Sequence, residues 1–203
     1  MKKAALSCIA LAAIAALIVL ATYTGPGGSP AAATRDDYPL AVGLKWTYRS
    51  VGNVAVVRAI DRTVEIDGRR YFEMKYALPI LGTRTIPMRP TTNGVATSRE
   101  GREFLLLRFP MTPGTAWTID LPGEKEIADC TVVGEEEMEF LGRKGRAVKT
   151  EVRRRSRGSD RTSIDYEWYA KGVGLVKMQV TLGLQATFVL ESFENSAQVP
   201  DRR

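Results

Sequence analysis

One motif occurs twice in this 203-residue chain, and the repeat constrains the fold more than any other feature. The stretch YPLAVGLKWTY spans residues 38–48 and FPMTPGTAWTI spans 109–119, so both follow the pattern aromatic-Pro-[Leu/Met]-x-x-Gly-x-x-Trp-Thr-apolar. An internal repeat indicates that one structural unit is duplicated. We therefore expect a single domain over residues 38–193, with one copy at 38–108 and the other at 109–193.

Apolar and polar residues alternate along most of the chain after residue 38. Trp46 and Tyr48, for example, alternate with Lys45 and Thr47. A period of two is typical of β-strands, and the short glycine or proline turns between these runs can join only antiparallel strands. The sequence therefore predicts an all-β, antiparallel fold. It would consist of two six-stranded internal repeats forming a curved sheet or an open barrel, preceded by an N-terminal signal or anchor helix.

The stretch WYAKGVGLVK, residues 168–177, admits two interpretations. Its G-x-G and following lysine could form a phosphate-binding loop, which needs a helix directly after the glycines. Alternating residues flank it on both sides instead, so we predict a hairpin turn in which Gly172 and Gly174 supply positive φ and a bulge. Folding the hairpin places Trp168 beside Val176 and directs Asp165 and Glu167 to the outer face.

A second hairpin allows a prediction of register. If the turn spans residues 141–145, Met138 pairs with Val148 and Glu137 lies opposite Lys149. One face of this hairpin would then be apolar, and the other would carry cross-strand ion pairs. We interpret the glutamate-rich run 135–139 as a solvated strand, because a strand directs alternate carboxylates to opposite faces and cannot converge them on a metal ion.

The N-terminal segment is typical of an exported protein. Lys2 and Lys3 precede an apolar run from Ala4 to Ala21, which is near the minimum length for a membrane span. Residues 1–21 could be a signal peptide cleaved after Ala21 or after Ala33, or an uncleaved membrane anchor. Residues 22–37 would then form a flexible linker, and 194–203 a C-terminal tail. We expect the domain in the periplasm or cell envelope, where an uncleaved segment 4–21 would tether it to the cytoplasmic membrane.

The composition excludes several classes of site. The chain has no histidine and two cysteines, and Cys130 is the only one beyond the apolar run. Catalytic triads with histidine, imidazole metal sites and iron–sulfur clusters are therefore excluded, and we predict no cofactor and no metal. The net charge of +6 does not argue for a nucleic-acid partner. Chemistry by paired carboxylates stays open, with Asp165 and Glu167 beside Trp168 as the candidate pair.

Two groups of residues are candidates for binding. The tryptophans could be core anchors or a surface on which a sugar or apolar ligand stacks. The arginine-rich stretch 153–161 could be a solvated hairpin tip or a contact with anionic lipid or an acidic polymer, because guanidinium groups fit phosphate and carboxylate. The candidate residues are Trp46, Trp117 and Trp168 for a ligand, and Arg153, Arg154, Arg155 and Arg157 for an anionic surface.

The elements PLxxGxxWxY, residues 39–48, and WYAxGVGLVK, residues 168–177, resemble a group of uncharacterised bacterial envelope proteins and lipoproteins with domain-of-unknown-function labels. FPMxxGxxW, residues 109–117, is similar to their middle segment, so the resemblance covers most of 38–193. The chain more distantly resembles the open half-barrels of periplasmic lipoprotein and lipid carriers, although it has no segment that could form their lid helices. The resemblance implies a fold and no catalytic residue.

We therefore expect a non-catalytic exported envelope protein that binds an apolar or amphipathic ligand or another envelope component. The partner would be an envelope lipid, a polysaccharide or a protein. Two alternatives remain: a carboxylate-based glycoside hydrolase acting on cell-wall polysaccharide, and a purely structural interaction domain.

Overall fold

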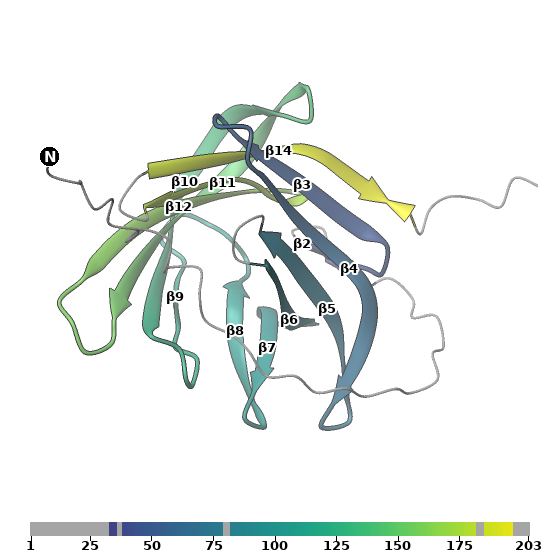
Figure 1. Cartoon of the computed structure of the whole chain (residues 1–203), viewed down its shortest axis with the longest axis vertical. Helices are drawn as coiled ribbons and strands as arrows, with labels where there is room; N and C mark the ends of the chain where they lie inside the picture. Colours follow the sequence, from purple (N-terminus) through teal and green to yellow (C-terminus); the bar gives the residue numbers. More distant parts are fainter. Residues whose placement is uncertain (1–32, 36–37, 79–81, 182–184, 197–203) are drawn as a thin grey trace, which may run out of the picture.

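The structure is a computed structural model that describes residues 33–35, 38–78, 82–181 and 185–196 (Figure 1). It confirms the predicted all-β, antiparallel fold. The described residues form strands β1 Ala33–Arg35, β2 Tyr38–Leu40, β3 Leu44–Ser50, β4 Ala55–Ile66, β5 Arg69–Leu78, β6 Gly82–Thr91, β7 Gly94–Arg99, β8 Arg102–Arg108, β9 Ala116–Ile119, β10 Glu126–Phe140, β11 Arg143–Ser156, β12 Thr162–Ala170, β13 Gly174–Thr181 and β14 Gln185–Asn195.

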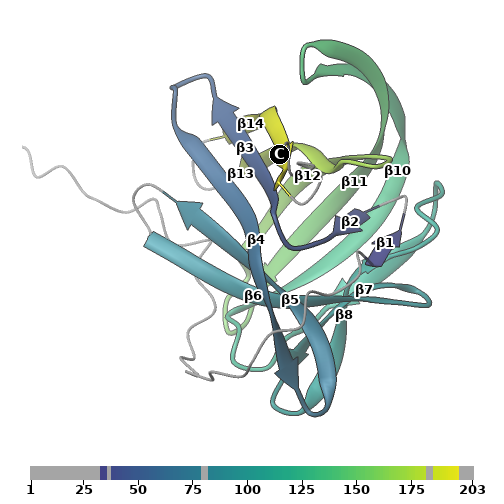
Figure 2. The ribbon, with the colours of Figure 1, turned by 90° about the vertical axis from the view of Figure 1, so that its right-hand side faces the viewer.

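Twelve strands form one sheet in the order β8-β7-β6-β5-β4-β3-β14-β13-β12-β11-β10-β9. Each copy of the repeat supplies six consecutive strands, β3–β8 and β9–β14, and the first strand of one copy pairs with the last strand of the other at the β3–β14 junction. The sheet curls until its edge strands β8 and β9 lie side by side, which gives a nearly closed barrel (Figures 1 and 2).

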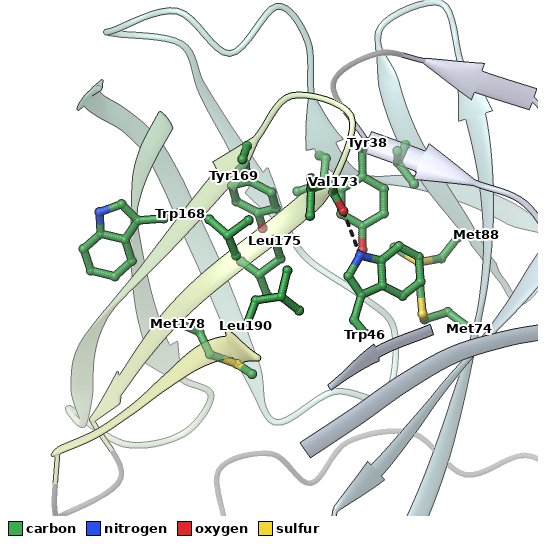
Figure 3. Close-up of a cluster of buried hydrophobic side chains, with 14 of the residues drawn as sticks. Tyr38, Trp46, Met74, Met88, Trp168, Tyr169, Val173, Leu175, Met178 and Leu190 are labelled. Atoms are coloured by element: carbon green, nitrogen blue, oxygen red, sulfur yellow. Dashed lines mark hydrogen bonds between the residues drawn. The ribbon is translucent and has the colours of Figure 1, made fainter. Parts of the chain in front are cut away.

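The short strand β2 brings the two sequence motifs together. Its three residues are buried, and Tyr38 lies against β13, where a Cβ added at Gly174 would meet the Tyr38 ring at 3.1 Å. Trp46, from the same motif as Tyr38, donates a hydrogen bond of 2.7 Å from Nε1 to the carbonyl oxygen of Val173 (Figure 3). Gly174 is therefore required both for its positive φ of 85° and for the close approach of an aromatic ring.

The β12–β13 turn forms as predicted, but the register beyond it does not. Gly172 and Gly174 have φ of 75° and 85°, and Tyr169 pairs with Leu175 as the predicted hairpin requires. A bulge then leaves Val176 unpaired, so Trp168 pairs with Lys177. The predicted Trp168–Val176 pairing is wrong because one bulged residue shifts every later pair.

The structure also corrects the predicted position of two carboxylates. Glu167 pairs with Met178, and Asp165, on the same face, is only 2% exposed. The prediction that Asp165 and Glu167 lie on the outer face is therefore wrong, because they pair with Val152 and Thr150, which are buried on the inner face of β11.

The register of the β10–β11 hairpin also differs from the prediction. Phe140 pairs with Arg143 across a two-residue turn in which Leu141 and Gly142 have φ of 52° and 67°. Met138 consequently pairs with Gly145, and the predicted partner Val148 is wrong. The cause is the turn itself, since two residues with positive φ close a tighter hairpin than the five-residue loop we expected.

The predicted boundaries fall partly outside the described residues. The signal or anchor segment 1–21 lies wholly outside them, whereas 33–35 of the predicted linker form β1 and pair with β2. Strand β14 extends to Asn195, two residues past the predicted boundary of the domain. Within the described residues, no helix is long and apolar enough to cross a membrane.

Candidate functional site

An arginine occupies the inner face of the barrel wall. Arg58 of β4 is paired directly with Trp46 of β3 and with Tyr76 of β5, so the three side chains share the inner face. Its guanidinium lies 5.3 Å from the centre of the Tyr48 ring and 4.7 Å from that of Tyr76. No carboxylate within the described residues forms an ion pair with Arg58, although Glu167 attracts it at longer range. Tyrosine rings therefore take the place of a counter-ion.

Two further tyrosines complete this surround. The rings of Tyr38 and Tyr169 have centroids 6.2 Å apart, and the Tyr169 hydroxyl donates a hydrogen bond to Oε2 of Glu167. Burial raises the pKa of Tyr169 well above its ordinary value, and the Glu167 carboxylate raises it further. Burial likewise raises the pKa of Tyr38. Both phenols therefore stay protonated and can donate hydrogen bonds.

A true ion pair lies on the opposite wall. Arg154 Nε of β11 donates a hydrogen bond of 2.7 Å to Oδ2 of Asp165, whose other oxygen accepts one of 2.7 Å from the backbone N–H of Thr181. Burial alone would lower the pKa of Arg154, but the carboxylates of Glu167 and Asp165 hold it above its ordinary value. In this pair each charge has a close partner of opposite sign, whereas Arg58 has no such partner within the described residues.

The unsatisfied polar side-chain atoms of the described residues all lie on the inner face of the sheet, on strands β4, β7 and β11. Four buried side-chain atoms have no hydrogen-bond partner within the described residues, and each belongs to a side chain that the strand register places on the inner face. Native proteins contain few such atoms, and each costs about 1–3 kcal/mol. Their concentration on one face indicates a surface that another molecule can satisfy. They are Arg58 Nε, Thr97 Oγ1, Arg99 Nε and Thr150 Oγ1.

Burial differs between the two ends of the interior. Near β2 the inward side chains are almost fully covered, as for Trp46 and Leu175, each 1% exposed. Towards the other end, Tyr76, Arg84 and Phe188 occupy inward positions and are only half-buried. Arg58 lies between these zones, with a half-buried side chain whose Nε is fully buried. The exposure of the inward side chains thus rises from the β2 end to the other end, with Arg58 at the boundary.

The three predicted tryptophans do not form one surface. Trp46 is buried beside Phe193, with ring centroids 5.3 Å apart, and Trp117 on β9 is 8% exposed. Trp168 points away from the interior (Figure 3). The ammonium groups of Lys149 and Lys177 cover its ring at 5.2 and 4.2 Å. All three are anchors within the wall, and none stands open to a ligand as a flat platform.

The four predicted arginines also separate. Arg153, Arg155 and Arg157 point outward and pair with Glu151, Asp129 and Asp120 respectively. Arg154 faces the interior in the ion pair with Asp165. Alternation along β11 thus divides the stretch between two faces, and carboxylates neutralise its outward members.

Sequence analysis missed Arg58, which has the most unusual environment of the inward residues. Its signal was present, since Arg58 is a single cation within the apolar run Ala55–Ile60 of a predicted strand. Cys130, the one cysteine beyond the N-terminal apolar run, is a core residue that is 2% exposed. Burial raises the pKa of its thiol to about 12, which makes a reactive thiolate at neutral pH unavailable.

Comparison with known proteins finds solved structures of similar fold and identifies no activity. No protein-family model and no curated protein matches the chain. Among solved structures, it is similar to a presumed exported protein with a YmcC-like fold from Bacteroides fragilis, with a TM-score of 0.50 and 15% identity over 77% of this chain and 98% of that one. A presumed lipoprotein from Parabacteroides distasonis matches with a TM-score of 0.42 and 16% identity over 77% of this chain and 97% of that one. The hypothetical lipoprotein YmcC from Escherichia coli matches with a TM-score of 0.39 and 11% identity over 73% of this chain and 83% of that one.

Proposed function

We propose that this chain is a non-catalytic protein of the cell envelope that binds an amphipathic ligand with an anionic head group inside the barrel. Arg58 would hold the head group, and the apolar inner wall would hold the tail. The location rests on the N-terminal pattern of Lys2, Lys3 and the run Ala4–Ala21, and on the similarity in fold to a presumed exported protein.

The observation that carries this proposal is that the Arg58 guanidinium forms no ion pair within the described residues and that its buried Nε has no acceptor. A buried cation without a close counter-ion is unfavourable, and an arginine is always charged near neutral pH. Tyr38 and the sulfur of Met178 contact the guanidinium, and the Glu167 carboxylate attracts it only at longer range. A carboxylate or phosphate beside Arg58 would supply both the missing charge and the missing acceptor.

The surroundings define the rest of the ligand. Met74, Met178 and Leu190 are buried on the same inner surface as Trp46 (Figure 3). These side chains offer no hydrogen bonds and favour a hydrocarbon tail. An anionic amphiphile therefore fits the site better than a sugar, which would need polar partners along its whole length.

A fluorescence titration tests the proposal. We would titrate the full chain with cis-parinaric acid, a fluorescent long-chain carboxylate, and compare Arg58→Gln with Arg62→Gln. Arg62 lies on the same strand, but its side chain is outward and 58% exposed. We expect Arg58→Gln to weaken binding by about tenfold or more and Arg62→Gln to have no effect. Equal affinities for the two variants, or no binding by the parent protein, would refute the proposal.

The second candidate is the carboxylate-based glycoside hydrolase, because Asp165 and Glu167 both face the interior and a pair of carboxylates is what that chemistry uses. Against it, Arg154 and the Thr181 N–H engage Asp165, and the Tyr169 hydroxyl engages Glu167. Release of reducing sugar from purified cell-wall polysaccharide by the parent chain, and its loss in Glu167→Gln, would favour this candidate over the first.

A further inference from the structure

The duplicated fold contains two junctions between its copies, and they differ. At the first, β14 of the second copy pairs with β3 of the first copy through a ladder that runs from Phe188–Ser50 to Asn195–Leu44. At the second, the equivalent strands β8 and β9 lie side by side without a backbone ladder between them. The two copies are therefore joined by a hydrogen-bonded ladder at one junction and not at the other. We call the β8–β9 junction, which has no ladder, the seam.

Two side chains hold one end of this seam. Trp117 Nε1 on β9 donates a hydrogen bond of 3.0 Å to the carbonyl oxygen of Leu106 on β8. In the opposite direction, Arg108 Nη1 on β8 donates a hydrogen bond of 3.0 Å to the carbonyl oxygen of Ala116 on β9. Each bond contributes about 1 kcal/mol, far less than a full ladder. A few such bonds can break and form again without unfolding either strand.

Beyond these bonds the seam contains a groove of about 460 Å³. Phe104 on its β8 side is an inner-face residue, since it pairs with Thr97. Thr118 on its β9 side is an outer-face residue, since it pairs with Asp129, which binds the outward Arg155. Residues of both faces therefore line the groove, which lies at the boundary between the inside and the outside of the barrel. The lining residues are Arg102, Phe104, Leu105, Thr118, Asp120, Pro122 and Arg157.

The groove combines apolar and charged side chains. Phe104, Leu105 and Pro122 are apolar, whereas Arg102 stands over the Phe104 ring at 5.6 Å and, within the described residues, has no ion-pair partner. An amphiphile passing between the strands would therefore meet apolar side chains for its tail and the Arg102 guanidinium for its anionic head group.

We propose that the β8–β9 seam is a lateral portal through which the amphipathic ligand enters and leaves the barrel. The proposal rests on the function proposed above. A portal changes the rates of association and dissociation together and leaves the equilibrium affinity unchanged, which distinguishes it from a residue that binds the ligand.

A reversible staple across the seam tests this. In a full chain carrying Cys8→Ser and Cys130→Ala, we would introduce Leu105→Cys with Thr118→Cys, oxidise the pair, verify the cross-link by mass spectrometry, and mix with cis-parinaric acid in a stopped-flow instrument. We expect oxidation to slow association by at least about tenfold and reduction to restore it. Unchanged association in the verified cross-linked protein would overturn the portal.

A matched control uses the closed junction. Lys45 and Glu194 are register partners on the outer face of β3 and β14, so Lys45→Cys with Glu194→Cys places a staple where a ladder already exists. We expect oxidation there to leave both rates unchanged, and an equal slowing in this variant would overturn the portal by showing a general effect of rigidity.

One variant needs no cross-link. Trp117→Phe removes a seam hydrogen bond while keeping an aromatic ring, so both rates should rise several-fold at constant Kd; unchanged rates would overturn the portal. If the reduced proteins and the parent bind no cis-parinaric acid, the proposed function fails and the portal fails with it. Normal binding with rates insensitive to every seam change overturns the portal alone.

Discussion

Two inward-facing arginines should respond differently to the same substitution. Arg154 forms a close ion pair with Asp165, whose side chain is 3% exposed, whereas Arg58 has no ion-pair partner within the described residues. Replacing either by methionine keeps much of the side-chain volume and removes the charge. Arg154→Met leaves a buried carboxylate without its cation, and Arg58→Met breaks no ion pair within the described residues.

The expected magnitudes follow from these contacts. Breaking a buried ion pair costs about 3–5 kcal/mol, and because the Arg154 side chain is 29% exposed we take the lower end, about 3 kcal/mol. At Arg58 the loss of two cation–π contacts, about 1–2 kcal/mol in total, is offset by removal of an unsatisfied buried Nε, about 1–3 kcal/mol. We therefore expect Arg58→Met to leave the free energy of unfolding almost unchanged.

Urea unfolding of the full chain, followed by tryptophan fluorescence, measures both changes. Arg154→Met should lower the free energy of unfolding by about 3 kcal/mol, which corresponds to a fall in Tm of about 6–12 °C for a domain of this size. A double variant with Asp165→Asn should recover part of the loss. If Arg58→Met destabilises as much as Arg154→Met, then Arg58 has a structural partner and does not serve to bind a ligand.

Three other predictions concern the framework. A Cβ at Gly94 would lie 1.8 Å from a main-chain oxygen of β8, so Gly94→Ala should lower the free energy of unfolding by about 3 kcal/mol or more. Gly101 has open space around it, so Gly101→Ala should lower it by only about 1 kcal/mol. Comparable losses for the two variants in urea unfolding would contradict this. A hydrogen bond from Arg89 lowers the pKa of Glu103 to about 2, so its stabilisation is present above the ordinary pKa of 4.5 and is lost as pH falls from there towards 2. Unfolding measured at pH 6 and pH 3 should show a smaller difference in Glu103→Gln, and an identical pH dependence would count against the pairing. Cys130, 2% exposed, should react with a thiol reagent only after unfolding, and rapid labelling of the native chain would disprove its burial.

The repeat, the strands and the β12–β13 turn were predictable because they depend on local information. Alternation of polarity identifies a strand, and the glycines at 172 and 174 take the positive φ that their turn requires. The motif repeated at Trp46 and Trp117 predicted two equivalent units, and each supplies six strands. These features follow from short stretches of chain that need no knowledge of distant contacts.

Which face of a strand points inward was decided by the tertiary structure. In β12 alternation places Trp168 on an apolar face and Glu167 on a charged face, a pattern that favours the apolar face inside. The barrel instead turns the charged face inward, where Glu167 pairs with the buried Thr150 of β11, and Lys149 and Lys177 cover the outward tryptophan. The candidate site depends on this choice, because the inward Glu167 attracts Arg58 only after distant strands close into a barrel, and no local pattern determines that closure.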